Sequence, residues 1–115
     1  MRRDLDRLED ILTETINIAS FVEGLTFESF IAERGRRYPI LHALAIIGEA
    51  SDQLSPELRA RHEAVPWRSI VGFRHSVVDG YDRLNLDLVW QSAIQLAPEL
   101  REQIQAVLAI EYPDA

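Results

Sequence analysis

The chain has 115 residues, with 12 basic and 19 acidic side chains, a formal net charge of −7 and 47% hydrophobic residues. This length suits one domain, and the hydrophobic content indicates a folded domain rather than a disordered segment. The absence of cysteine excludes disulfides, thiolate metal sites and a cysteine nucleophile. We therefore expect a single domain over residues 1–115.

Location and partners are constrained by charge and hydropathy. No apolar run approaches the ~20 residues of a membrane span, and charges at Arg2, Arg3 and Asp4 replace the apolar core of a secretory signal. We expect a cytoplasmic protein that does not enter a membrane. Every basic residue is arginine, which reflects either genome composition or selection for bidentate phosphate recognition. The acidic total disfavours a protein that coats nucleic acid, but it permits a local basic cleft.

The first half of the chain shows helical periodicity and no strand pattern. Apolar residues at steps of three, four or seven predict a helix over residues 4–22 that ends at Gly24. Residues 27–33 predict a short helical or irregular segment, closed by an arginine-rich turn at residues 34–37. A second long helix is expected over residues 38–54, with Pro39 tolerated in its first turn.

The second half continues the pattern. Ser55 followed by Pro56 and Glu57 predicts the start of a short helix, which ends before Pro66. Further helices are expected over residues 67–81 and 87–110; Gly80 should end or distort the first, and Pro98 should kink the second. The sequence therefore predicts an all-α domain, and wide apolar stripes on so short a chain favour a dimer.

The chemically informative residues lie in the helix expected over residues 67–81. Arg74 and Tyr81 are seven positions apart and share a helix face, whereas His75 and Asp79 are four apart and adjacent. An arginine, a histidine, a carboxylate and a phenol therefore fall within about two helical turns.

Several segments, in this order and spacing, resemble the HepT-like branch (DUF86) of the HEPN superfamily, and the resemblance covers nearly the whole chain. The segments are Ile46-Ile47-Gly48-Glu49-Ala50, Leu54-Ser55-Pro56-Glu57, Pro66-Trp67, Ile70-Val71-Gly72-Phe73-Arg74, Leu86-Asp87-Leu88-Val89-Trp90, Leu96-Ala97-Pro98-Glu99-Leu100 and Ile104.

The resemblance implies an up-and-down antiparallel bundle of about four to five helices that forms a homodimer. It also implies the toxin of a type VII toxin–antitoxin system: an endoribonuclease that cleaves RNA (mRNA or tRNA) with no metal or other cofactor, at a site composed by both subunits. The implied partner is a minimal nucleotidyltransferase antitoxin (MntA-like), which attaches AMP to the tyrosine of the toxin motif.

That motif runs arginine, polar residue, three residues, histidine, any residue, tyrosine. Arg74 matches the arginine, His75 takes the polar position and Tyr81 matches the tyrosine that the partner modifies, but Asp79 replaces the histidine. RNA cleavage needs a group that removes the 2′-hydroxyl proton and one that protonates the 5′-oxygen. Histidine does either near neutral pH, whereas aspartate is a weak base that repels phosphate. Arg74 would still stabilise the pentacovalent phosphorane.

Three explanations account for Asp79. The protein is a naturally degenerate family member that binds RNA or serves as a scaffold, or Asp79 is an introduced inactivating change. In the third explanation, His75 transfers the protons and Asp79 orients its ring. The catalytic set implied by the resemblance is thus Arg74, His75 and Asp79. The alternative function is a non-catalytic HEPN protein that binds a nucleotidyltransferase or RNA.

Structural roles compete with these assignments. Arg74 could be an interfacial arginine paired with Asp79 or Glu49, Tyr81 a core-capping aromatic, and His75 a solvated or helix-capping residue.

Other polar residues are assigned mainly structural or surface roles. We interpret His42 as structural, His62 as a surface residue near a helix end, and the arginines of residues 34–37 as a solvated turn rather than an RNA contact. No two histidines have metal-ligand spacing, which disfavours a zinc or iron site. Residues 59–83 carry five arginines and three carboxylates, a balance that fits a confined phosphate site.

Overall fold

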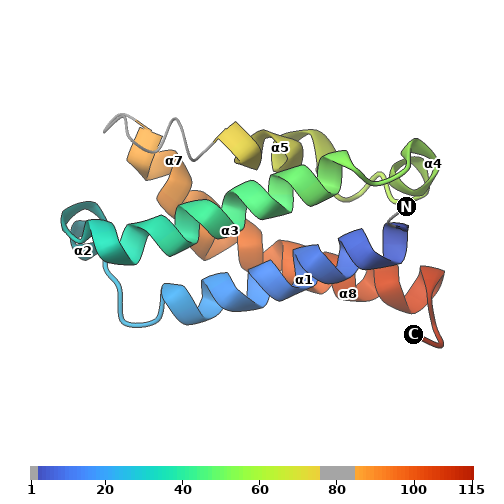
Figure 1. Ribbon diagram of the computed structural model, residues 1–115, viewed down its shortest axis with the longest axis horizontal. Coiled ribbons are helices and arrows are strands. Elements are labelled where there is room, and N and C mark those ends of the chain that lie inside the picture. Colours follow the sequence, from blue (N-terminus) through green and yellow to red (C-terminus); the bar gives the residue numbers. More distant parts are fainter. Residues whose placement is uncertain (1–2, 76–84) are drawn as a thin grey trace.

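The computed structural model describes residues 3–75 and 85–115, and within these ranges every regular element is helical. Three long helices dominate it: α1 (Asp4–Phe21), α3 (Arg34–Asp52) and α8 (Ala97–Glu111). Both α3 and α8 run antiparallel to α1, and the two ends of the chain lie at the same end of the bundle (Figure 1). This confirms the all-α bundle. None of the described helices is long and apolar enough to cross a membrane.

The connection from α1 to α3 follows local signals in the sequence. α1 ends as expected, and Gly24 adopts φ +75°, a left-handed conformation that favours glycine. α2 (Phe27–Ala32) then begins with a capping box, in which the Thr26 hydroxyl accepts from the Ser29 N–H at 3.1 Å and the Ser29 hydroxyl accepts from the Thr26 N–H at 2.9 Å. The short segment expected at residues 27–33 is therefore a capped helix.

The expected start of the second long helix was wrong. Residues 34–37 form the first turn of α3 instead of a separate turn, and Pro39 lies inside the helix rather than in its first turn. The helix tolerates this proline because the carbonyl that loses a partner belongs to Gly35, in the exposed first turn.

Arg37 corrects the prediction of a solvated arginine turn. Its side chain is buried, and Nη1 donates to the carbonyl oxygens of Ile31 at 2.6 Å and Phe30 at 3.4 Å. These carbonyls lie at the end of α2, so Arg37 joins α2 to α3. Arg34 and Arg36 remain exposed, as expected.

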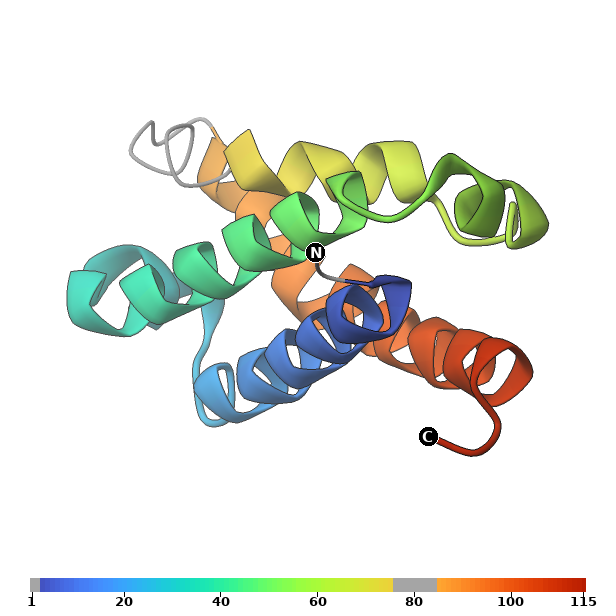
Figure 2. The ribbon, with the colours of Figure 1, turned by 45° about the vertical axis from the view of Figure 1, so that its right-hand side comes forward.

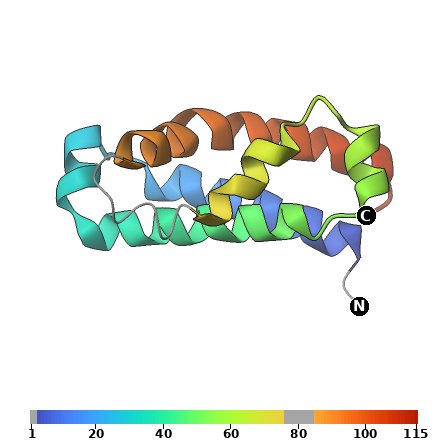
Figure 3. The same cartoon turned by 90° about the horizontal axis from the view of Figure 1, so that it is seen from above.

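The chain then returns across α3 through two short helices. α4 (Pro56–Arg61) begins at the expected serine cap, where Ser55 Oγ accepts from the Leu58 N–H at 3.3 Å. The Ser55 hydroxyl and N–H also donate to the Asp4 carboxylate at 2.6 and 2.9 Å, which fixes α4 against the start of α1. α5 (Trp67–Val71) lies across α3 and continues into the 3₁₀ turn η1 (Gly72–His75), as Figure 3 shows.

Within the described residues, the helix predicted over residues 67–81 is α-helical from Trp67 to Val71 and 3₁₀ from Gly72 to His75. Its apolar residues Ile70 and Phe73 are buried as expected. The remainder of the predicted helix, including Gly80, lies outside the described residues.

The last helix is interrupted as predicted, but a π-helical segment before Pro98 makes the interruption, rather than a kink at Pro98 itself. α7 (Leu86–Gln91) passes through a π-helical segment, η3 (Ser92–Leu96), into α8, and the chain changes direction there (Figure 2). The N–H of Ala97 donates to the carbonyl of Ser92, five residues earlier. This shift in hydrogen bonding lets Pro98, which has no N–H, occupy the first turn of α8.

Candidate functional site

Arg74 lies in the 3₁₀ turn η1, against the C-terminal end of α3. Its Nη1 donates to Asp52 Oδ2 at 2.7 Å and lies 3.9 Å from Glu49 Oε2. The two carboxylates are three residues apart on α3, so both reach the same guanidinium. The side chains of Arg74 and Asp52 are each 38% exposed, and that of Glu49 is 57% exposed. Arg74 is therefore a positioned cation that an anion from solvent can still reach.

Glu49 is one of the two partners expected for Arg74, but the closer partner, Asp52, was missed. The signal for it was present, because Asp52 follows Glu49 at helical spacing at the end of a predicted helix. Asp79, the other expected partner, and Tyr81 lie outside the described residues. His75 ends η1, directly after Arg74.

Gly48 brings the backbone of Arg74 against α3. A β-carbon at Gly48 would lie 2.5 Å from the backbone nitrogen of Arg74, 2.9 Å from the Val71 carbonyl oxygen and 3.1 Å from that of Ile70. All three atoms belong to the backbone and cannot swing aside, so only glycine fits this contact. Arg74 therefore packs beside Gly48, which precedes Glu49 by one residue and Asp52 by about one helical turn on α3.

An open hollow of about 490 Å³ lies beside this ion pair, between α3, α4 and α5. Asp52 forms part of its wall and therefore belongs both to the hollow and to the Arg74 pair. Its other lining residues are Pro56, Arg59, Ala60, Trp67, Arg68 and Val71.

Comparison with known proteins decides the family. The family model "Ribonuclease HepT-like" matches residues 6–107 of this chain. The chain belongs to the HepT-like family. The resemblance to HEPN proteins seen in the sequence is thereby confirmed.

Curated relatives agree with this assignment. A "Putative RNase" of Caldanaerobacter subterraneus subsp. tengcongensis is 34% identical over 104 residues, which cover 90% of this chain and 93% of that protein. A "Putative RNase" of Methanocaldococcus jannaschii is 29% identical over 100 residues, covering 87% and 92%. A "Probable ribonuclease HepT" of Thermococcus cleftensis is 27% identical over 104 residues, covering 90% and 94%. No solved structure matches the chain significantly.

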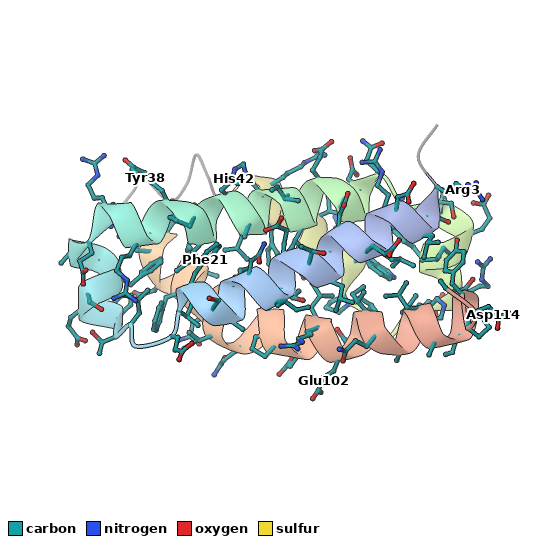
Figure 4. The ribbon with its side chains drawn as sticks, turned by 60° about the horizontal axis from the view of Figure 1, so that its bottom comes forward. Arg3, Phe21, Tyr38, His42, Glu102 and Asp114 are labelled. Atoms are coloured by element: carbon teal, nitrogen blue, oxygen red, sulfur yellow. The ribbon has the colours of Figure 1, made fainter. Side chains whose placement is uncertain are left out.

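Two histidines of this HepT-like chain have surroundings that differ from those expected. The sequence predicts a structural role for His42, yet this residue is exposed on α3 and points away from the bundle (Figure 4). The sequence predicts that His62 is a surface residue near a helix end, but its side chain is only 12% exposed, and Nε2 lies 2.7 Å from Glu111 Oε2. The reason is that His62, which directly follows α4, lies against the end of α8 and contacts Glu111 there.

Arg61 completes this contact with a bidentate pair to Glu111, at 2.7 Å from Nη2 to Oε1 and 3.1 Å from Nε to Oε2. Hydrogen bonds from Arg61 and then from His62 lower the pKa of Glu111 from 4.5 to about 2. The cluster joins α4 to α8 and lies apart from Arg74. Among the described residues, no group of three or more histidine, aspartate or glutamate side chains could hold a metal ion.

Proposed function

We propose that this HepT-like protein is an endoribonuclease that acts on RNA without a metal, with Arg74 at its active site. The observation that carries the proposal is the partly exposed guanidinium of Arg74, held 2.7 Å from Asp52, on a residue whose backbone packs on Gly48. The chain that carries it is matched by a ribonuclease family over residues 6–107. The names of three relatives as ribonucleases support the same activity.

In the proposed reaction, the 2′-hydroxyl oxygen attacks the adjacent phosphorus and the bond from phosphorus to the 5′-oxygen breaks. The products are a 2′,3′-cyclic phosphate and a 5′-hydroxyl end. The proton of the 2′-hydroxyl goes to a base, and the 5′-oxygen takes up a proton as it leaves. Arg74 stabilises the extra negative charge on the phosphorane oxygens, because its planar guanidinium donates two parallel hydrogen bonds.

The groups proposed to serve proton transfer are His75, directly after Arg74 in the chain, and Asp79, five positions after Arg74. In this arrangement His75 transfers the protons and Asp79 orients its ring. A neutral or protonated imidazole is available near pH 7, whereas an aspartate by itself is too weak a base for efficient transfer.

We further propose that the protein acts as a homodimer and as the toxin of a toxin–antitoxin pair. The dimer would bring two copies of Arg74 towards one cleft. The antitoxin would be a minimal nucleotidyltransferase that adds AMP to Tyr81, and the added phosphate would compete with RNA for Arg74. Incubation with such an enzyme and ATP should add AMP to the peptide containing Tyr81, and Tyr81→Phe should abolish the addition.

A second candidate function is a non-catalytic protein that binds RNA or a nucleotidyltransferase. The observation that favours it is Asp79, which takes the place of the motif histidine and removes a proton-transfer group. Binding would then persist without cleavage.

The deciding experiment measures cleavage of a labelled single-stranded RNA in excess EDTA. Wild type should cleave, Arg74→Ala should lose cleavage by about 10²-fold or more, and Arg101→Ala should match wild type. Arg101 is a suitable control because it lies on α8 and lines a different hollow, between α1 and α8. Binding of the RNA without cleavage by wild type would favour the second candidate.

A further inference from the structure

The hollow beside Arg74 has the composition of a site for a sugar-phosphate backbone. Two guanidinium groups, those of Arg59 and Arg68, line it, and its only described carboxylate is that of Asp52. Its remaining lining is apolar and includes Trp67, whose Nε1 donates to the His62 carbonyl oxygen at 3.0 Å. This hydrogen bond fixes the indole in the floor of the hollow.

Arg59 and Arg68 differ from other arginines near them. Arg61 is paired with Glu111 and Arg74 with Asp52. In residues 3–75 and 85–115, by contrast, Arg59 and Arg68 make no ion pair or side-chain hydrogen bond with another described residue. Arg68 is exposed and Arg59 is half-buried, so no described residue occupies either guanidinium group and both can bind an external anion.

The charge balance of the hollow favours an anion even though the whole chain is acidic. Asp52 already accepts a hydrogen bond from Arg74 at 2.7 Å, and this pairing reduces its repulsion of a phosphate. Among the residues that line the hollow, Arg59 and Arg68 carry two positive charges against the one negative charge of Asp52. The hollow therefore has a local positive charge within a chain of net charge −7.

We propose that this hollow is a subsite for single-stranded RNA, in which Arg59 and Arg68 bind the backbone phosphate next to the one held by Arg74. The inference rests on the proposed function, because it takes the phosphate at Arg74 as the reacting one. Guanidinium groups bind phosphate oxygens bidentately, and single-stranded nucleic acid follows positive grooves that also offer aromatic or apolar surface. Because each nucleotide brings another phosphate, a strand that reaches Arg74 can place a second phosphate in the hollow.

The test measures binding of fluorescent 2′-O-methyl RNA by anisotropy, because this probe lacks the attacking hydroxyl and cannot be cleaved. Wild type is compared with an Arg59→Gln/Arg68→Gln double variant and with Arg101→Gln as the matched control. The double variant should bind about tenfold more weakly, and its salt dependence should fall by about 0.7 in slope, the value for one phosphate of a single strand. Arg101→Gln should leave the affinity and the slope unchanged.

A second readout separates a binding role from a structural one. Wild type should bind a trinucleotide with two internal phosphates more tightly than a dinucleotide with one, and the double variant should lose this difference. If the double variant does not fold, each single variant should show part of the same loss. Wild-type affinity in both single variants, or in the folded double variant, would overturn the subsite.

The outcomes also separate the subsite from the proposed function. Cleavage that depends on Arg74 but not on Arg59 or Arg68 would support the ribonuclease proposal and overturn the subsite proposal. RNA binding that depends on Arg59 and Arg68, without cleavage by wild type, would support the RNA-binding subsite and overturn the ribonuclease proposal. Failure of wild type to bind the probe would overturn the subsite, and failure to cleave RNA as well would overturn both proposals.

Discussion

A β-carbon at Gly48 would lie 2.5 Å from the backbone nitrogen of Arg74. The position of the candidate catalytic arginine is thus determined by the absence of a side chain on a different helix. Because the contact is made with backbone atoms, it sets where η1 lies on α3, and with it the 2.7 Å distance from Arg74 Nη1 to Asp52 Oδ2.

Replacing Gly48 should therefore displace Arg74. Gly48→Ala should lower the free energy of unfolding by about 1–3 kcal/mol, the usual cost of an added group in a filled space, and should reduce RNA cleavage. Urea unfolding and the EDTA cleavage assay measure the two effects. Gly72→Ala is the matched control, because a β-carbon there meets no atom within 4 Å. Equal effects of the two substitutions would contradict this account.

Removing the charge of Asp52 should strengthen RNA binding. Asp52 competes with a phosphate for Arg74, and an exposed ion pair of this kind is worth about 0.2–1 kcal/mol. Asp52→Asn should then bind the non-cleavable RNA about 1.5- to 5-fold more tightly by anisotropy. The same change in the exposed tail, Asp114→Asn (Figure 4), should leave binding unchanged. Weaker binding by Asp52→Asn would show that Asp52 positions Arg74 rather than competing for it.

Stability should depend on pH through Glu111. Its pKa is about 2 in the folded protein against 4.5 ordinarily, so its ion pairs stabilise the fold fully above about pH 4.5. As the pH falls from 4.5 towards 2, this contribution is lost. Glu111→Gln should flatten the pH dependence of the free energy of unfolding in that window, measured by urea titration. Glu102→Gln, on the exposed face of α8 (Figure 4), should retain the wild-type dependence.

Restoring the motif histidine should raise activity. Asp79→His supplies a group that titrates near neutral pH, and general acid–base groups contribute about 10²–10⁴-fold. Cleavage in EDTA should increase by a factor in this range. If wild type already cleaves and His75→Ala abolishes cleavage, His75 performs the proton transfer in this chain. If neither Asp79→His nor wild type cleaves RNA, the result would favour the second candidate function, a non-catalytic protein that binds RNA or a nucleotidyltransferase.

The composite site that we propose requires two subunits. Light scattering at micromolar concentration should give about twice 13.2 kDa, the mass of one chain. Mixing Arg74→Ala with wild type should then reduce activity below the value expected from the wild-type fraction alone. A monomer that cleaves RNA would contradict a site shared across the dimer.

Local signals and residue order were enough to predict the helical class, most helix ends and the family. Periodic apolar positions, the Ser55 cap and the turn at Gly24 act over a few residues, and the structure confirms each of them. The sequence also identified Arg74 as the residue of interest. It could not locate the start of α3, since Pro39 interrupts the local pattern while packing extends the helix to Arg34.

The surroundings of the arginines, by contrast, depend on tertiary packing. Asp52 lies 22 positions before Arg74 in the chain, and Glu111 lies 49 after His62, so both contacts depend on how distant helices pack. For Asp52 the sequence offers only its helical spacing from Glu49, and for Glu111 it offers no local pattern. Arg37 is buried, whereas Arg59 and Arg68 face an open hollow, although all three occupy polar positions on predicted helices or turns. The physical reason is that the charge of a residue is encoded locally, but its partner is set by how the helices cross. That crossing depends on close contacts such as the one at Gly48.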